Sequence, residues 1–262
     1  MTLAQQIIEA GLRLLEEGLT HGTAGNVSAR CPDGESMLIT PSGRDFRQLR
    51  DSDIVRLHLT STRTEGHQKP SSEWRLHLAI YRARCDVHAV IHHHATFASA
   101  VAVAQKTIPV IIDEAADIGP IPTTPYALSG SQELAEVTAA ALARGSNAVL
   151  LANHGAVAVG RDLGETMHRA LEVERLAQMY IWAEILGGAR ALDETEVSRS
   201  KKFLEAYRAA AAEGRDGLSS ASITVNPICL KDIVHYSFQA GITFASLVQS
   251  LILQKIYCDK KN

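Results

Sequence analysis

Apolar and polar residues recur with a helical period in several long segments of the chain. The first helix is predicted to begin after Thr2, a capping residue, and to end at Gly18. Asp162 is placed to cap a long helix that ends near Gly187 and Gly188. Further helices are expected from Ser71 to about Arg84, over 95–104 and 132–144, and from about Glu194 to Ala212.

Short apolar segments between turn residues predict strands. The expected ranges are Asn26–Arg30, Met37–Thr40, Ile54–Leu59, His88–His94, Thr107–Ile112, Ala148–Asn153 and Ala156–Val159. The segment from Gly119 to Gly130 contains Pro120, Pro122 and Pro125 and is expected to be a loop. Because strands and helices are interleaved, the pattern predicts an α/β fold, and very short joints between strands predict several antiparallel neighbours.

The last part of the chain differs from the rest. Gly214, Gly217 and the pair Ser219-Ser220 predict a flexible joint, after which apolar residues follow at loosely helical spacing. We therefore expect a catalytic domain over 1–213 and a C-terminal extension over 214–262. One interpretation of this extension is a terminal helix packed on the body, or an appendage without a defined role. The other is a helix that binds a membrane surface or a partner.

Composition excludes several classes of protein. The chain has 262 residues, 46% of them hydrophobic, and its 26 Lys and Arg against 29 Asp and Glu give a net charge of −3. These values are typical of a globular protein and give no electrostatic reason to bind nucleic acid or an acidic membrane. The four cysteines are scattered, and no secretory signal or long apolar run is present. We expect a cytoplasmic protein whose partner is a small molecule.

The clearest chemical signal is the run of three histidines at 92–94. In a strand, side chains alternate between the two faces, so His92 and His94 would share one face and His93 would point away. Such a pair can form two ligands of a metal ion. His154, in a tight turn before Gly155, is a further candidate, although an isolated histidine there is more often structural. The run alone leaves metal binding and a hydrogen-bonded polar face equally open.

Glu73 is a fourth candidate ligand, and its carboxylate could also move protons. The alternative is that it only complements the dipole of the helix expected to start at Ser71. Three segments are suited to an anion such as phosphate: this helix start, the glycine-rich turn 22–28 and the turn 40–43. Each of these turns is a weak signal by itself.

Taken in order, the segments GTAGNVS, ITPSG, KPSSEW, the strand H-x-H and NHG resemble the class II aldolase/adducin family, with fuculose-phosphate aldolases as the most similar members. The resemblance covers about Leu3 to Ala212. It implies a three-layer α/β/α fold with a central, mostly antiparallel sheet flanked by helices, and a homotetramer with active sites between subunits. It also implies a Zn²⁺ site, or a site for another divalent metal, and a phosphate pocket. The implied metal ligands are Glu73, His92, His94 and His154, and the implied phosphate-binding residues are Gly25, Asn26, Ser42, Gly43, Ser71 and Ser72.

The activity implied by the resemblance is cleavage of a fuculose-phosphate-like ketose 1-phosphate to dihydroxyacetone phosphate and an aldehyde, with Glu73 as the catalytic acid/base. One departure is that Asp113 stands where the family has a proton-donating tyrosine, although Tyr207 matches another tyrosine that closes the family's site. Alternatives within the family are a pentulose-phosphate 4-epimerase, which the pair Ala116-Asp117 favours, and a 3-oxo sugar-acid phosphate decarboxylase. A non-catalytic module like that of adducin is the alternative of another class.

Overall fold

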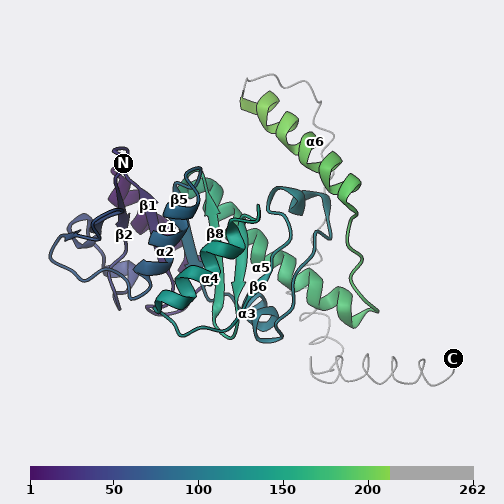
Figure 1. Cartoon of the computed structure of the whole chain (residues 1–262), viewed down its shortest axis with the longest axis horizontal. Coiled ribbons are helices and arrows are strands. Elements are labelled where there is room, and N and C mark those ends of the chain that lie inside the picture. The colour runs from purple at the N-terminus through teal and green to yellow at the C-terminus, as the bar shows by residue number, and fades with distance from the viewer. Residues whose placement is uncertain (213–262) are drawn as a thin grey trace, which may run out of the picture. The chain divides into compact units, whose positions relative to one another are not determined.

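The structure is a computed structural model that describes residues 1–212 (Figure 1). The predicted extension 214–262 lies outside the described residues, so the proposed domain boundary stays a prediction. The α-helices are α1 (Leu3–Glu16), α2 (Trp74–Ala83), α3 (Thr96–Val103), α4 (Gln132–Leu142), α5 (Leu163–Ile185) and α6 (Glu194–Ala212). Short 3-10 helices are η1 (Phe46–Gln48), η2 (Asp51–Asp53) and η3 (Asp113–Asp117).

A single eight-stranded sheet in the order β4-β3-β2-β1-β5-β8-β7-β6 forms the centre of the described fold. Every neighbouring pair is antiparallel except β6 and β7. The strands are β1 (Asn26–Arg30), β2 (Ser36–Ile39), β3 (Val55–His58), β4 (Thr64–Glu65), β5 (Ala89–His93), β6 (Thr123–Thr124), β7 (Ala148–Leu151) and β8 (Gly155–Gly160). The predicted mostly antiparallel sheet is confirmed.

Helices cover both faces of this sheet, which confirms the predicted three layers. One core joins the sheet to α1, α3 and α5, and the other joins it to α2 and α4. Neighbouring residues of β5 show the alternation: Val90 belongs to the core beneath α2 and α4, whereas Ile91 belongs to the opposite core. His92 therefore lies on the same side of the sheet as α2.

Most predicted helix boundaries are confirmed, and α1, α4 and α5 each carry a side-chain cap at the N-terminus, at Thr2, Ser131 and Asp162. The hydroxyl of Thr2 accepts a hydrogen bond from the Gln5 backbone, and the Asp162 carboxylate accepts one from Glu165. The helix expected from Ser71 begins at Trp74, so Glu73 lies at its cap position without a capping hydrogen bond from its side chain. The carboxylate of Glu73 is used elsewhere.

The predicted strand Thr107–Ile112 is wrong. Only Ile108 forms a bridge, an isolated antiparallel one with Ile121, through two backbone hydrogen bonds of 2.8 and 3.0 Å. The next pair in this register would be Val110 and Gly119, but the Gly119 N–H donates to the Ala115 carbonyl at 2.9 Å and the Val110 carbonyl accepts from the Leu192 N–H at 2.8 Å, so the ladder does not continue. The predicted loop at 119–130 contains the short strand β6. Within residues 1–212, no helix combines the length and apolar composition needed to cross a bilayer.

Candidate metal centre

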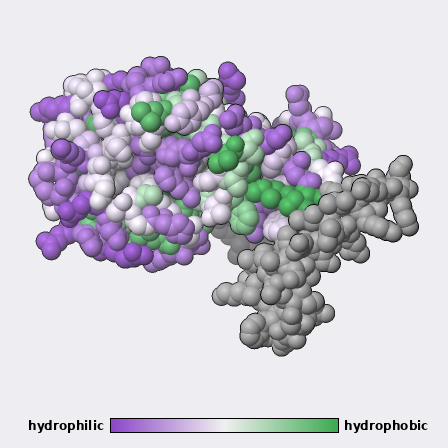
Figure 2. All heavy atoms as spheres, turned by 90° about the horizontal axis from the view of Figure 1, so that it is seen from below, coloured by the Kyte–Doolittle hydropathy of each residue, from purple (hydrophilic) through white to green (hydrophobic). Residues whose placement is uncertain are grey.

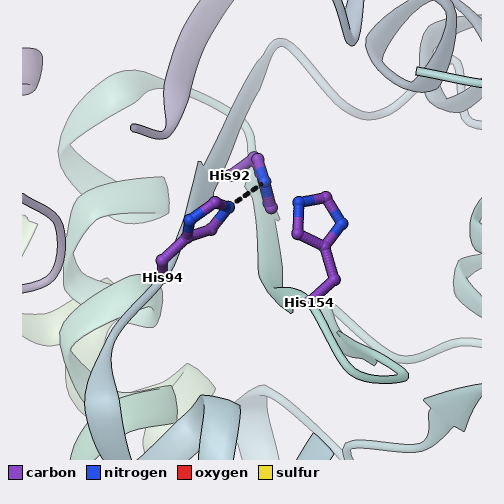
Figure 3. A group of neighbouring side chains, drawn as sticks. All are labelled: His92, His94 and His154. Carbon is purple, nitrogen blue, oxygen red and sulfur yellow. Dashed lines mark hydrogen bonds between the residues drawn. The ribbon is translucent and has the colours of Figure 1, made fainter. Parts of the chain in front are cut away.

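His92, His94 and His154 converge on one point, where β5 ends beside the turn between β7 and β8 (Figure 3). One ring nitrogen from each lies within 4.8 Å of the others, and the ring centroids are 4.7–4.9 Å apart. Nε2 of His92 and Nε2 of His94 are 2.9 Å apart. Ligands of a tetrahedral zinc ion lie about 3.4 Å apart when each Zn–N bond is about 2.1 Å. The three imidazoles are therefore placed as a candidate metal site.

The alternation of β5 explains why two of the three adjacent histidines meet. His92 ends up on the α2 side, whereas His93 falls on the opposite side of the sheet with Ile91, as the strand pattern predicted. His94 follows the last residue of β5, and its backbone N–H donates to the Leu19 carbonyl at 3.1 Å. This hydrogen bond fixes the chain where it leaves the strand, so the ring of His94 turns back toward His92.

His92 is completely buried, and its ring is oriented by the sheet. Its Nδ1 lies 2.9 Å from the carbonyl oxygen of Ala156 on the neighbouring strand β8. Burial alone would lower the pKa of His92, but the charge of Glu73 and its hydrogen bond more than offset it, so that pKa is raised. Because a carbonyl only accepts hydrogen bonds, Nδ1 keeps its proton, and Nε2, which faces Glu73 and the cluster, is the nitrogen that would give up a proton to a bound metal. A backbone contact thus selects the tautomer that a metal requires.

His154 enters from the turn between β7 and β8, where its N–H donates to the Leu151 carbonyl at 3.0 Å. Asn153 has a φ of 56°, so Asn153 supplies the left-handed conformation of this turn. Gly155 has a different role, since a Cβ atom there would meet the His93 carbonyl oxygen and would lie 2.8 Å from Cδ2 of His94. Asn153 thus provides the sharp turn, and Gly155 provides the space that His93 and His94 occupy.

Glu73 adds a buried carboxylate to the three imidazoles. Its Oε2 is 3.0 Å from Nε2 of His92, and its Oε1 is 3.6 Å from Nε2 of His154. Asn26 donates a hydrogen bond to Oε2 at 2.9 Å, and the hydroxyl of Ser129 donates to Oε1 at 3.1 Å. Both oxygens of this carboxylate are therefore held, one on each side.

The protonation states suit a cation. Burial, together with His92 and His154, lowers the pKa of His94 to about 4, and burial also lowers the pKa of His154. Burial alone would raise the pKa of Glu73, but His92, His154 and Asn26 more than offset it, so that pKa lies well below its usual range. Two neutral imidazoles and one carboxylate are donors that a divalent metal accepts.

The three predicted anion-binding turns lie next to one another. The N–H of Ser42 donates to the Lys69 carbonyl, and the N–H of Ser71 donates to the Thr40 carbonyl, both at 3.0 Å. The hydroxyl of Thr40 accepts from the Val27 N–H at 3.2 Å, which joins the glycine-rich turn to the other two. Ser42, Gly43 and Ser72 are exposed, Gly25 is half-buried, and Asn26 and Ser71 are buried. Phosphate binding by these six residues stays a prediction.

Two residues considered from the sequence lie apart from the four metal-site candidates within the described chain. The Asp113 carboxylate accepts a hydrogen bond from Ser200 of α6 at 2.7 Å. Tyr207 is 55% exposed and stacks on Phe203 of the same helix, with ring centroids 6.4 Å apart. Neither residue contacts the histidines or Glu73 among residues 1–212.

Three residues of this region were not recognised in the sequence: Ser129, His77 and Tyr81. Ser129 lies near the end of the proline-containing loop 119–130, and a serine there gives no signal of its own. His77 and Tyr81 are fully buried on α2 and connect through Ser28 and Asn26 to Glu73. The spacing of four residues from Glu73 to His77 and from His77 to Tyr81 places all three on one helix face, and this signal was available.

A helix-flanked, mostly antiparallel sheet with a histidine-rich candidate metal centre at the end of its central strand β5 defines the class of protein. Residues 5–181 match the family described as Class II Aldolase and Adducin N-terminal domain, and the chain belongs to this family. The resemblance found in the sequence is thereby confirmed.

Relatives of known activity are aldolases, which are carbon–carbon lyases. The chain is 44% identical over 181 residues to L-fuculose phosphate aldolase of Escherichia coli strain K12, covering 68% of this chain and 82% of that protein. It is 41% identical over 209 residues to a 5-methylthioribulose-1-phosphate/5-deoxyribulose-1-phosphate aldolase of Rhodospirillum rubrum, covering 79% and 93%. A solved L-fuculose 1-phosphate aldolase superposes with a TM-score of 0.74 at 36% identity, covering 78% of this chain and 96% of that one. The predicted fold and enzyme class are confirmed.

Proposed function

We propose that this protein is a zinc-dependent aldolase that cleaves a fuculose-phosphate-like ketose 1-phosphate to dihydroxyacetone phosphate and an aldehyde. The observation that carries the proposal is the convergence of the Glu73 carboxylate with His92 and His154, beside His94. A proton-transfer group in contact with a metal site is the arrangement that carbon–carbon cleavage without a lysine Schiff base requires.

The names of the relatives support a 1-phosphorylated ketose as the substrate. Fuculose, 5-deoxyribulose and 5-methylthioribulose phosphates occur among them, and these sugars differ at the end away from the 1-phosphate. Cleavage between C3 and C4 of each gives the same triose phosphate and a different aldehyde. Dihydroxyacetone phosphate is therefore the product common to all of these cleavages, and substrate screening would identify the aldehyde.

His92, His94 and His154 would hold the zinc ion, and Glu73 would be its fourth protein neighbour. When bound, zinc supplies Lewis-acid stabilisation of the negative charge that develops on the substrate as the bond breaks. The residues present suit this ion, since the Ala156 carbonyl fixes the tautomer of His92 and burial keeps His94 and His154 neutral.

Glu73 would move the proton in the cleavage. When the C3–C4 bond breaks, C4 becomes the aldehyde carbon and the proton of its hydroxyl is lost to solvent, while the electron pair stays on C3, where a proton must be added to complete the triose phosphate. Glu73 would deliver that proton in cleavage and remove it in the reverse direction. Hydrogen bonds from Asn26 and Ser129 hold its carboxylate in a fixed orientation for both directions.

The adjacent turns would hold the phosphate of the substrate. Gly25, Asn26, Ser42, Gly43, Ser71 and Ser72 are the proposed residues. Ser42, Gly43 and Ser72 reach solvent at one surface, whereas Ser71 lies underneath, with its hydroxyl accepting a hydrogen bond from the Glu73 N–H at 3.3 Å. Ser71 and Ser72 of the proposed phosphate site directly precede Glu73 in the chain, so binding one end of the sugar would align the other with the carboxylate.

One structural observation weighs against the epimerase alternative. Asp117, which suggested it, is paired with Arg169 at 3.1 Å and with Arg208 at 2.7 Å. An aspartate held by two guanidinium groups is not free to act on a sugar within its own chain. The decarboxylase alternative would use the same metal ligands. It differs from the proposed aldolase in its product, carbon dioxide. The adducin-like alternative is not favoured, because all four candidate metal-site residues are present and assembled.

A homotetramer in the cytoplasm completes the proposal. Figure 2 shows a largely hydrophilic face of the described part with smaller apolar areas. Large apolar side chains are exposed at the end of α5 and on α6, among them Trp182, Leu186, Phe203 and Tyr207. Such residues are typical of a surface that another subunit covers. Light scattering on the purified full-length protein would give the oligomeric state.

The decisive experiment is a screen of the zinc-loaded protein against phosphorylated ketoses and 3-oxo sugar-acid phosphates, with identification of the products. Formation of dihydroxyacetone phosphate from a ketose 1-phosphate would support the proposal. An isomeric pentulose phosphate would indicate the epimerase, and carbon dioxide would indicate the decarboxylase. Measurement of about one zinc ion per chain in the same preparation would test the metal site independently of turnover.

A further inference from the structure

A line of buried polar side chains leads from Glu73 into the core between α2 and β1. Glu73, His77 and Tyr81 follow each other at intervals of four residues and therefore face the same way from the start and body of α2. Asn26 and Ser28 are two residues apart on β1 and point to the same face of the sheet. All five side chains are at least 95% buried. Five polar groups in such a position require partners.

Each of these side chains contacts the next. Asn26 donates through Nδ2 to Oε2 of Glu73 at 2.9 Å, and its Oδ1 is hydrogen-bonded to Nε2 of His77. Nδ1 of His77 lies 2.6 Å from the hydroxyl of Ser28, and that hydroxyl lies 2.9 Å from the hydroxyl of Tyr81. We call these four residues, Asn26, His77, Ser28 and Tyr81, the buried relay.

The directions of the hydrogen bonds in the buried relay follow from the chemistry of its ends. An ionised carboxylate only accepts, so the amide of Asn26 must present its N–H to Glu73 and its oxygen to His77. His77 therefore donates from Nε2 and accepts at Nδ1. Ser28 must then donate to His77, and Tyr81 donates to Ser28. One arrangement satisfies every group.

We propose that His77 is a positioning residue for catalysis, acting through Asn26 to hold the Glu73 carboxylate in the orientation that proton transfer needs. The inference rests on the proposed function, because it concerns the acid/base assigned there. The amide of Asn26 has nearly the same shape when turned by half a rotation, so shape alone does not fix its orientation. The carboxylate of Glu73 accepts from one side of the amide and the N–H of His77 donates to the other, so both partners select the same orientation and His77 anchors it from within the core.

Burial makes His77 suitable for this role. Burial, together with the charge of His92, lowers the pKa of His77 to about 3, so the ring stays neutral. A neutral imidazole ring donates a hydrogen bond from one nitrogen and accepts one at the other, whereas a doubly protonated ring only donates. With the N–H of His77 removed, the oxygen of Asn26 would lose its buried donor, and the amide would no longer be held on both sides in the position from which it donates to Glu73.

Two variants separate positioning from a general loss of stability. His77→Leu keeps the bulk but removes both hydrogen bonds, whereas His77→Gln retains an N–H that can reach the oxygen of Asn26. We expect His77→Leu to lower kcat about 10- to 100-fold, with KM changed less than about twofold and bound zinc unchanged. His77→Gln should recover most of the rate. Thr138→Val is the matched control, because it removes a buried hydroxyl that bonds only to the Leu134 carbonyl within α4.

A double-mutant cycle tests whether His77 acts through Glu73. In a Glu73→Gln background, His77→Leu should cost less than about twofold in the residual rate, since the carboxylate that it positions is absent. An equal loss in both backgrounds, or a His77→Leu variant with unchanged kcat, would overturn the inference. If His77→Gln is as slow as His77→Leu, positioning through a donated hydrogen bond is also wrong.

Nitrogen NMR of the His77 ring gives a readout that does not depend on activity. In the wild-type protein we expect the proton on Nε2 and an unprotonated Nδ1. The opposite tautomer would overturn the inference even in an active enzyme. If no ketose 1-phosphate is cleaved but the expected tautomer is found, the proposed function fails while the orientation of Asn26 by His77 stands.

Discussion

Oε2 of Glu73 lies 3.0 Å from Nε2 of His92, and both groups are almost completely buried. The first comes from the start of α2 and the second from the centre of the sheet at β5. Because the ring of His92 is fixed by the Ala156 carbonyl, the carboxylate meets a rigid partner. The contact brings a candidate proton-transfer group against a candidate metal ligand, and the predictions below begin from it.

Replacing Glu73 by Gln should leave the fold and most of the zinc in place. The amide has the shape of the carboxylate but cannot accept or deliver the proton, so kcat should fall by about 10²- to 10⁴-fold. Steady-state kinetics and metal analysis on the same samples check both statements. Glu133→Gln, at an exposed carboxylate on α4, is the matched control and should be neutral. Unchanged turnover in Glu73→Gln would remove Glu73 from the acid/base role.

His92→Ala and His93→Ala should have opposite effects on bound zinc. His92 is a proposed ligand, so its loss should reduce zinc below stoichiometric levels and abolish activity together. His93 lies on the other side of the sheet, so His93→Ala should keep zinc even if the cavity left in the core lowers stability by about 2–3 kcal/mol. Elemental analysis after dialysis measures the difference. Zinc loss in His93→Ala would contradict the strand alternation on which the site is built.

Much of the fold was predictable because local patterns and tertiary packing agree. The strand Asn26–Arg30 was predicted with the bounds that the structure shows, and the caps at Thr2 and Asp162 were predicted too. The segment 107–112 has the apolar composition of a strand, but a strand also needs partners along its length. Only Ile108 has one, and a single sequence does not reveal which segments lie beside each other.

The candidate site was predictable to the extent that it depends on spacing in the chain. The strand period placed His92 and His94 together and His93 apart, and the family resemblance added His154 and Glu73. His77 was not found, because one histidine on an amphipathic helix gives the same pattern whether it fills the core or orients a neighbour. Its role becomes visible only when β1 is seen to bring Asn26 and Ser28 against the same helix face.

Gly155→Ala should disturb the metal site, although Gly155 is not itself a proposed metal ligand. A methyl group there would be pressed against the His93 carbonyl, 2.8 Å from Cδ2 of His94 and 3.3 Å from Cε1 of His92. Since backbone and two rings cannot all move away, we expect zinc affinity to fall at least about tenfold. Zinc titration with a competing chelator measures this.

Gly164→Ala is the matched control for Gly155→Ala. Gly164 lies in the first turn of α5, and the nearest atom to an added Cβ is Oδ1 of Asp162 at 3.3 Å. Alanine is well tolerated in a helix, so zinc affinity should match that of the wild type. Equal zinc affinity in both variants would show that the space at Gly155 is not needed by the histidines.

Asp117→Asn should lower stability at neutral pH and have less effect in acid. Burial alone would raise the pKa of Asp117, but the hydrogen bond from Arg208 and the charge of Arg169 more than offset it, so its pKa is lowered. A lowered folded-state pKa contributes stability that is present above the unfolded value of about 4 and is lost as pH falls through the folded value. The carboxylate is partly open to solvent, so we expect a loss of about 1 kcal/mol at pH 7.

Urea unfolding at pH 7 and at about pH 3 measures this effect. The difference in free energy of unfolding between the wild type and Asp117→Asn should be smaller at pH 3. Asp86→Asn, which removes the more exposed pair of Asp86 with Arg84, is the control and should change stability less at both pH values. A difference for Asp117→Asn that is the same at both pH values would mean that the charge of Asp117 does not stabilise the fold.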